Sequence, residues 1–330
     1  MSGIYAISDE ELVCLCIIVI PLLRKASMFG RKPSDNSQPN EESNMTGLIK
    51  ILGCDNPSRR GDVVFVHGLA GDAWNTWHWQ NPGDRDYQKD NFWLTWLGND
   101  LVDIGIWTFG YSAARLRAHG SAMPLFDQAS NFLDDLENYD IGERPIVFVT
   151  HSMGGLLVKK MLNAAKTFSR NKSKEAILKS TQGIIFLSTP HLGSDIAQWV
   201  KSLAGFLATI NVEELKAHAP QLRELDEWYR QNVDELGIQT KVYYETKRTN
   251  GVLIVNFSSA NPGIKDVKPI AVEADHNSIA KPEKGSKVHL GVKKFIEECL
   301  PSQKSLPPGD NSIPLQQTNP EKTANPQQPL

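Results

Sequence analysis

The chain has 330 residues, of which 40% are hydrophobic and 22% are charged, and its formal net charge at pH 7 is −3. This is the composition of an ordinary globular protein, and the lack of a basic excess argues against nucleic acid as a partner. Its four cysteines have neither the spacing of a metal site nor that of a secreted disulfide framework. We therefore expect an intracellular, reducing compartment and no metal or organic cofactor.

The first 45 residues combine an apolar segment, Leu12 to Leu23, with a polar linker. The apolar run is shorter than the roughly 18 residues that a membrane-spanning helix needs. Acidic residues at positions 9 to 11 occupy the place where a secretory signal carries positive charge. Two readings remain: a short anchor at a membrane surface, helped by acylation of Cys14 or Cys16, or a helix that packs on the domain.

Strand-type and helix-type patterns alternate between residues 46 and 300, which we expect to form one domain. The strand-type runs are Val63 to Val66, Ile104 to Tyr111, Ile146 to Val149, Gly183 to Leu187, Lys241 to Tyr244 and Pro269 to Glu273. Such alternation predicts an α/β fold with a mainly parallel sheet flanked by helices. Val252 to Asn256 fits either an extra strand or an elaborated loop. Residues 301–330 have no aromatic side chain and are expected to be disordered.

Five of the eight tryptophans lie between Trp74 and Trp96, close behind the first strand-type run. Trp93 and Trp96 fall in a helical stretch and are expected in the core. Trp74 and Trp77 either fill a core edge or line an apolar substrate mouth.

An apolar β-type run passes into a helix-type run through a turn centred on Ser152. A strand feeding directly into a helix lifts one side chain above the sheet at the helix N-terminus, where serine hydrolases keep their nucleophile. The elbow residues His151, Gly154 and Gly155 surround the serine, and the glycines allow close packing. Thr150 stands where the G-x-S-x-G pattern has its first glycine. We predict that Ser152 is a nucleophile.

Nucleophilic attack on an ester creates an oxyanion, which preorganised N–H donors must stabilise. The amide of Met153, next to the serine, is one expected donor. The other should come from the loop after an earlier strand, where His67 and the turn residue Gly68 are followed by Leu69. We predict an oxyanion hole made by the amides of Leu69 and Met153.

The order of a catalytic triad in this fold is Ser, then acid, then His, so the base should follow Ser152. His276 comes after the last strand-type run and before a final helical stretch, and is the predicted base; the alternative is a helix cap. His191 directly follows an earlier strand and comes too soon. His218 and His289 lie in helix-type stretches, where we expect solvated side chains.

The acid must sit at a neighbouring strand end, where it can orient the imidazole. Glu245 ends the penultimate strand-type run and is the first choice. Asp275 is adjacent to the base, so its side chain is expected to point elsewhere. Asp195 and Asp266 are kept as alternatives.

Apolar residues recur at helical spacing from Gln198 to Leu236, after the run Gly183 to Leu187, which corresponds to the sixth strand of a hydrolase sheet. This helical insertion predicts either core helices or a cap whose inner wall lines an acyl-chain site.

Several motifs together resemble those of the serine-active-site-containing (SERAC-like) family of α/β-hydrolases, over about residues 47–300. They are His67-Gly-Leu-Ala-Gly, His151-Ser-Met-Gly-Gly, Ser188-Thr-Pro-His-Leu-Gly, Tyr244-Glu-Thr and Asp275-His. That family is similar in motif to small triacylglycerol lipases and is linked to phospholipid remodelling where mitochondria meet the endoplasmic reticulum. The resemblance implies catalytic roles for Ser152 and His276, less directly for Glu245, and a location at those membranes or in the cytoplasm.

The sequence thus predicts an α/β-hydrolase that cleaves carboxylic esters, with lipid esters as the favoured substrates. The alternative from another class is a catalytically inactive hydrolase fold that serves as a binding or scaffold module.

Overall fold

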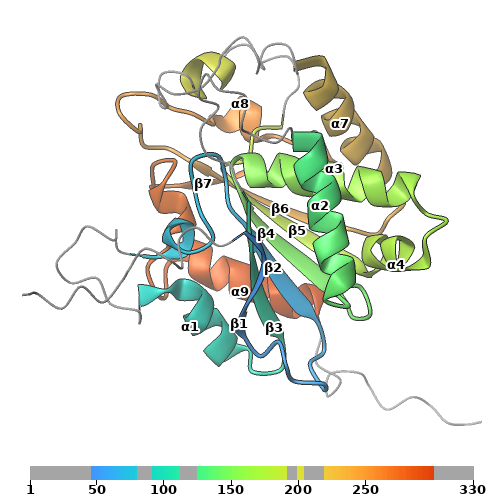
Figure 1. Cartoon of the computed structure of the whole chain (residues 1–330). Coiled ribbons are helices and arrows are strands. Elements are labelled where there is room, and N and C mark those ends of the chain that lie inside the picture. The colour runs from blue at the N-terminus through green and yellow to red at the C-terminus, as the bar shows by residue number, and fades with distance from the viewer. Residues whose placement is uncertain (1–45, 80–90, 112–124, 192–198, 204–218, 301–330) are drawn as a thin grey trace, which may run out of the picture. The chain divides into compact units, whose positions relative to one another are not determined.

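The computed structural model describes residues 46–79, 91–111, 125–191, 199–203 and 219–300. Their core is a seven-stranded sheet in the order β1-β3-β2-β4-β5-β6-β7 (Figure 1). The strands are β1 (Gly47–Leu52), β2 (Asp62–Val66), β3 (Gly105–Gly110), β4 (Ile146–His151), β5 (Thr181–Leu187), β6 (Gln239–Glu245) and β7 (Ile270–Val272). β1 is antiparallel to β3, and the other neighbouring pairs are parallel. The predicted α/β-hydrolase architecture, with a mainly parallel sheet, is confirmed.

The central strands are buried on both faces, as a parallel sheet requires. Every residue of β2, β3 and β4 is buried, and so is all of β5 except Gln182. Continuous apolar runs in these strands, rather than alternation, are what two covered faces demand.

Helices cover the two faces of the sheet in separate groups. They are α1 (Trp93–Asp100), α2 (Leu125–Asn138), α3 (Met153–Thr167), α4 (Lys172–Ser180), α7 (Ala219–Asn232), α8 (Phe257–Ala260) and α9 (Lys287–Cys299). One core cluster contains buried side chains of α2, α3, α4 and α7, and the other contains those of α1 and α9. Figure 1 shows α2, α3 and α4 on one side of the sheet, with α1 and α9 on the other. No described helix combines the length and apolar character needed to cross a membrane.

The tryptophan-rich segment belongs to a core. Trp77 and Trp93 are fully buried around Phe65 of β2, with ring centroids 5.2 and 5.1 Å from that ring. Trp74 and Trp96 are partly buried against the same cluster. The open question about Trp74 and Trp77 is therefore answered by core packing.

The structure settles two segments whose strands were missing or open in the sequence analysis. β1 is an additional strand that the sequence did not predict: only Leu48 of its six residues is buried, and the others are partly or fully exposed, so its pattern is weak. Val252 to Asn256 forms an elaborated loop, with a single bridge between Thr249 and Val252 before Asn256 caps α8.

The helical insertion follows β5. Trp199, Leu203, Leu222 and Leu225 are buried there. Positions 204–218, with His218 among them, lie outside the described residues, as do the predicted N-terminal segment and C-terminal tail.

Candidate active site

Ser152 stands between β4 and α3 in a conformation that non-glycine residues rarely adopt. Its backbone angles are φ 51° and ψ −125°, a strained geometry that surrounding structure must hold in place. The glycines after it are required by contact: a Cβ on Gly154 would stand 2.3 Å from the carbonyl oxygen of Val66, and one on Gly155 would stand 2.4 Å from Oγ1 of Thr189. The sharp turn therefore depends on glycine at both positions.

Thr150, where the motif would have glycine, is a buried residue of β4. Its hydroxyl donates to the carbonyl oxygen of Ile185 in β5, at 2.9 Å. The hydroxyl thus finds its partner within the sheet, and the turn accommodates the β-branched side chain.

The carboxyl ends of three parallel strands bring the predicted triad residues together. Nε2 of His276 lies 3.0 Å from Oγ of Ser152, and Nδ1 of His276 lies 3.3 Å from Oε1 of Glu245. Ser152 follows β4, Glu245 ends β6, and His276 follows β7. All three side chains are buried. A hydroxyl, an imidazole and a carboxylate in this order can pass a proton from the serine to the histidine.

Glu245 is held by its own loop as well as by the histidine. Its Oε1 accepts a hydrogen bond from the amide of Val255 at 2.6 Å, and its backbone amide donates to Oγ of Ser188 at 3.2 Å. Its Oε2 has no hydrogen-bond partner within the described part of the chain. The elaborated loop before α8 therefore fixes the carboxylate that faces the imidazole.

The other acid candidates lie differently. Oδ1 of Asp275 accepts from the amides of Asn277 and Ser278, at 3.0 and 2.8 Å, so that carboxylate closes its own turn as expected. Asp266 is exposed on a loop, and Asp195 is outside the described residues.

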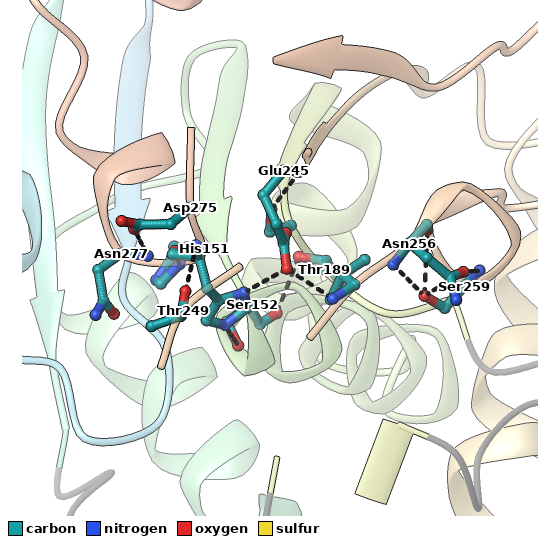
Figure 2. A network of polar contacts seen from close by, with 12 residues as sticks. His151, Ser152, Thr189, Glu245, Thr249, Asn256, Ser259, Asp275 and Asn277 are labelled. Carbon is teal, nitrogen blue, oxygen red and sulfur yellow. Dashed lines mark hydrogen bonds and ion pairs between the residues drawn. The ribbon is translucent and has the colours of Figure 1, made fainter. Parts of the chain in front are cut away.

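The segment that carries His276 is fixed by two neighbours (Figure 2). Its amide donates to Oγ1 of Thr249 at 2.9 Å, and Nε2 of His151 lies 2.7 Å from its carbonyl oxygen. Since a carbonyl only accepts, His151 carries its proton on Nε2. The elbow residue before the nucleophile thereby positions the base, a role that the sequence did not suggest.

The loop after β2 approaches the nucleophile closely. A Cβ on Gly68 would stand 2.7 Å from Cβ of Ser152, so only glycine fits. Leu69, the next residue, packs partly buried against the core. The loop of the predicted oxyanion donor thus borders the reacting hydroxyl.

Comparison with known proteins identifies sequence relatives of this chain. A family model described as "Putative serine esterase (DUF676)" matches residues 62–219. Protein SERAC1 of Danio rerio is 32% identical over 264 residues, and that of Homo sapiens is 31% identical over 261; each alignment covers 73% of this chain and 39% of the relative. The chain belongs to a SERAC-like family of α/β-hydrolases. It spans about two fifths of the length of these curated relatives.

Solved structures similar to this SERAC-like chain include lipases. Bacillus licheniformis lipase BlEst2 is 17% identical with a TM-score of 0.47, and the match covers 77% of this chain and 97% of the lipase. Phospholipase PlaB from Legionella pneumophila is 16% identical with a TM-score of 0.49, covering 73% and 60%. The family match supports an esterase-like hydrolase.

Two other histidines of the SERAC-like chain lie in the interior. The expectation that His289 is solvated was wrong, because its side chain is 2% exposed. Its ring packs in T-shaped contacts against Trp93 and Trp96, with centroid distances of 6.3 and 6.0 Å. Of its charged neighbours in the sequence, Lys287 and Lys294 are exposed, whereas Lys293 is partly buried and pairs with Asp100. His191 is also buried, and its Nδ1 lies 2.8 Å from Nζ of Lys159.

Three buried histidines resist protonation in this fold. Burial lowers the pKa of His67 to about 4, of His151 to about 3 and of His191 to about 4. In the unfolded chain a histidine has a pKa of about 6.5. Below that pH the unfolded chain binds protons that the folded chain does not. The contribution of these neutral histidines to the free energy of unfolding is therefore complete above about pH 6.5 and is lost as the pH falls toward 4.

We expect His67→Asn to flatten the pH dependence of stability, because asparagine cannot take up this proton. The free energy of unfolding of the wild type should fall by about 2 to 3 kcal/mol more than that of the variant between pH 7.5 and pH 4.5. Urea denaturation at a series of pH values measures the difference. Parallel pH curves for the two proteins would show that His67 is not held neutral.

Proposed function

We propose that this chain hydrolyses carboxylic esters, with Ser152 as nucleophile, His276 as general base and acid, and Glu245 as the acid that orients the imidazole. The observation that carries the proposal is the continuous contact from serine hydroxyl to imidazole to carboxylate, 3.0 and 3.3 Å in length. Random surface residues do not meet in this order at the ends of three parallel strands, beside a glycine-lined turn.

The reaction follows from the positions of these groups. His276 takes the proton of Ser152 as Oγ attacks the ester carbonyl, and the amides of Leu69 and Met153 receive the oxyanion. The imidazolium, whose Nδ1–H faces Glu245, then gives its proton to the departing alcohol. Water attacks the acyl-enzyme by the same route in reverse, which releases the acid and restores the serine.

Lipid esters are the substrate class that we propose. The support is the family resemblance together with the apolar character of the insertion after β5, whose described residues Trp199, Val200 and Leu203 pack in the same core cluster as α3. An apolar helical insertion at this place in the chain suits a cap over an acyl chain, whereas the polar groups of the site fix only the ester itself.

Labelling with a fluorophosphonate probe tests the chemistry. The wild type should be labelled and Ser152→Ala should not, because the probe reacts only with an activated serine. Ser180→Ala is the matched control, since it removes a hydroxyl that donates to the carbonyl oxygen of Gly142 at 2.5 Å, at the opposite end of the sheet. Absence of labelling in the wild type would favour a binding or scaffold module.

A panel of esters then defines the substrates. We expect hydrolysis of p-nitrophenyl esters and phospholipids to rise with acyl-chain length and to vanish in Ser152→Ala. A preference for acetyl esters would contradict the lipid assignment and leave the esterase assignment intact.

A further inference from the structure

The two peptide groups that supply the oxyanion hole are each held by a side chain on their carbonyl side. We propose that Thr189 and His67 are positioning residues, which aim the amides of Met153 and Leu69 at the developing oxyanion. This inference rests on the proposed function of Ser152, and neither residue touches the substrate.

Thr189 fixes the peptide between Ser152 and Met153. Its hydroxyl donates to the carbonyl oxygen of Ser152 at 2.9 Å, and the amide of Gly155 donates to the same oxygen at 3.2 Å. A trans peptide is planar, with its C=O and N–H on opposite sides. Holding the carbonyl oxygen toward Thr189 therefore turns the N–H of Met153 the other way, out of the elbow. Figure 2 shows Thr189 beside Ser152.

The second glycine of the elbow makes this contact possible. A Cβ on Gly155 would stand 2.4 Å from Oγ1 and 2.5 Å from Cγ2 of Thr189, which is fully buried there. The absence of a side chain at Gly155 thus leaves the space that Thr189 occupies. Thr189 after β5 and Gly155 after the nucleophile therefore fit together.

His67 fixes the peptide between Gly68 and Leu69 in the same way. The amide of Tyr111 donates to Nε2 of His67 at 3.2 Å, so that nitrogen carries no proton and Nδ1 carries it. Nδ1 then donates to the carbonyl oxygen of Gly68 at 2.9 Å, and the amide of Gly71 donates to the same oxygen at 3.1 Å. The N–H of Leu69 must point away from His67.

The imidazole of His67 is itself clamped. Its ring stacks on Tyr111 with centroids 4.3 Å apart, and the hydroxyl of Tyr111 donates to the carbonyl oxygen of His67 at 2.9 Å. The side chain is fully buried and neutral, as its lowered pKa requires. A rigid neutral donor is suited to holding one carbonyl in one direction.

The two amides, those of Leu69 and Met153, are free to donate, and their peptide groups are polarised. Neither the Leu69 nor the Met153 amide donates to a carbonyl of another described segment, so both remain available to a ligand. A carbonyl that already accepts hydrogen bonds also polarises the N–H of its own peptide, which strengthens that donor. Preorganised donors contribute mainly in the transition state, so their loss should lower kcat more than it changes KM.

The first test compares Thr189→Val with Thr189→Ser in the full chain, using the p-nitrophenyl ester that the wild type hydrolyses fastest. We expect Thr189→Val to lower kcat by about 10- to 100-fold with KM within about twofold. Binding of a trifluoromethyl ketone with the same acyl chain, which forms an oxyanion on Ser152, should weaken by the same factor. Thr189→Ser keeps the hydroxyl and should retain activity within about threefold.

Thr181→Val is the matched control. It removes an equally buried hydroxyl that donates to a helix carbonyl, that of Ile177 at 2.8 Å, at the far end of β5. It should lose similar stability and keep kcat within about twofold. Each rate is divided by the folded fraction of that variant, which urea denaturation measures.

Variants of His67 provide an independent experiment if Thr189→Val does not fold. His67→Phe keeps a ring against Tyr111 but loses the donor, and should lower kcat and ketone affinity by about 10- to 100-fold. His67→Asn can place an amide N–H where Nδ1 stood, and should retain most activity. Unchanged kcat in both donor-free variants, with an active wild type, would overturn this inference alone. A wild type with neither labelling nor hydrolysis would overturn the proposed function, and this inference with it.

Discussion

Replacing Glu245 with glutamine should lower kcat by about four powers of ten while the protein stays folded. Nδ1 of His276 lies 3.3 Å from Oε1 of Glu245, in a site where both side chains are buried. A neutral amide can still accept from the amide of Val255, but it cannot stabilise the imidazolium that forms as Ser152 attacks. KM should change little, because the lost interaction strengthens only in the transition state. Steady-state kinetics on the best ester measure the effect.

Two aspartates serve as controls for this assignment. Asp275→Asn alters a turn next to the base, and Asp266→Asn alters an exposed loop. Each should lower kcat by no more than about tenfold, since neither carboxylate is placed to orient Nδ1. A mild effect at Glu245 together with a severe one at Asp266 would reassign the acid.

The nucleophile was the part of the site most accessible from sequence. Its signal is local: an apolar run, a turn around Ser152 and an apolar helix lie within a few residues of each other. The backbone strain at Ser152 and the contacts of Gly154 and Gly155 are consequences of that short-range pattern. The sheet was predictable for the same reason, because its central strands are continuous apolar runs. β1 was not predictable in this way, because only one of its six residues is buried.

The acid was harder to predict because its identity depends on long-range contacts. Glu245 is 31 residues from His276 in sequence, and it is fixed by the amide of Val255 in a loop that could equally have been a strand. The positions of Thr189 and His67 were visible as parts of motifs, yet their hydrogen bonds to backbone carbonyls have no sequence signature. His289 misled for a related reason, since charged neighbours on a helix do not reveal which face is buried.

A buried ion pair also lay beyond the reach of sequence. In the sequence, Lys159 of α3 does not differ from the other lysines. In the structure its side chain is fully buried, with Nζ 2.6 Å from Oδ1 of Asp226 in α7. Nζ lies 5.4 Å from the ring centroid of Phe186 and 5.0 Å from that of Tyr229. The pair joins the helix behind the nucleophile to the helix that ends the insertion.

Asp226→Asn should lower the free energy of unfolding by about 3 to 5 kcal/mol, because it leaves the buried ammonium of Lys159 without a counter-charge. Urea denaturation at pH 7 measures the loss. Glu175→Gln is the control: it breaks the exposed pair between Glu175 and Lys179, whose side chains are 38% and 71% exposed, and should cost less than about 0.5 kcal/mol. Equal, small losses in the two variants would mean that the buried charge is not what matters.

The pH dependence of Asp226→Asn identifies the cause of its instability. Burial lowers the pKa of Lys159, and the charge of Asp226 opposes that shift. Without the carboxylate, the folded variant should hold the lysine proton less tightly than the unfolded chain does, so its stability should rise from pH 7 toward pH 9 relative to wild type. Replacing both partners, Lys159→Met with Asp226→Leu, removes the buried charges together and should recover most of the loss. If the double variant is as unstable as Asp226→Asn, packing of α7 rather than an unpaired charge explains the effect.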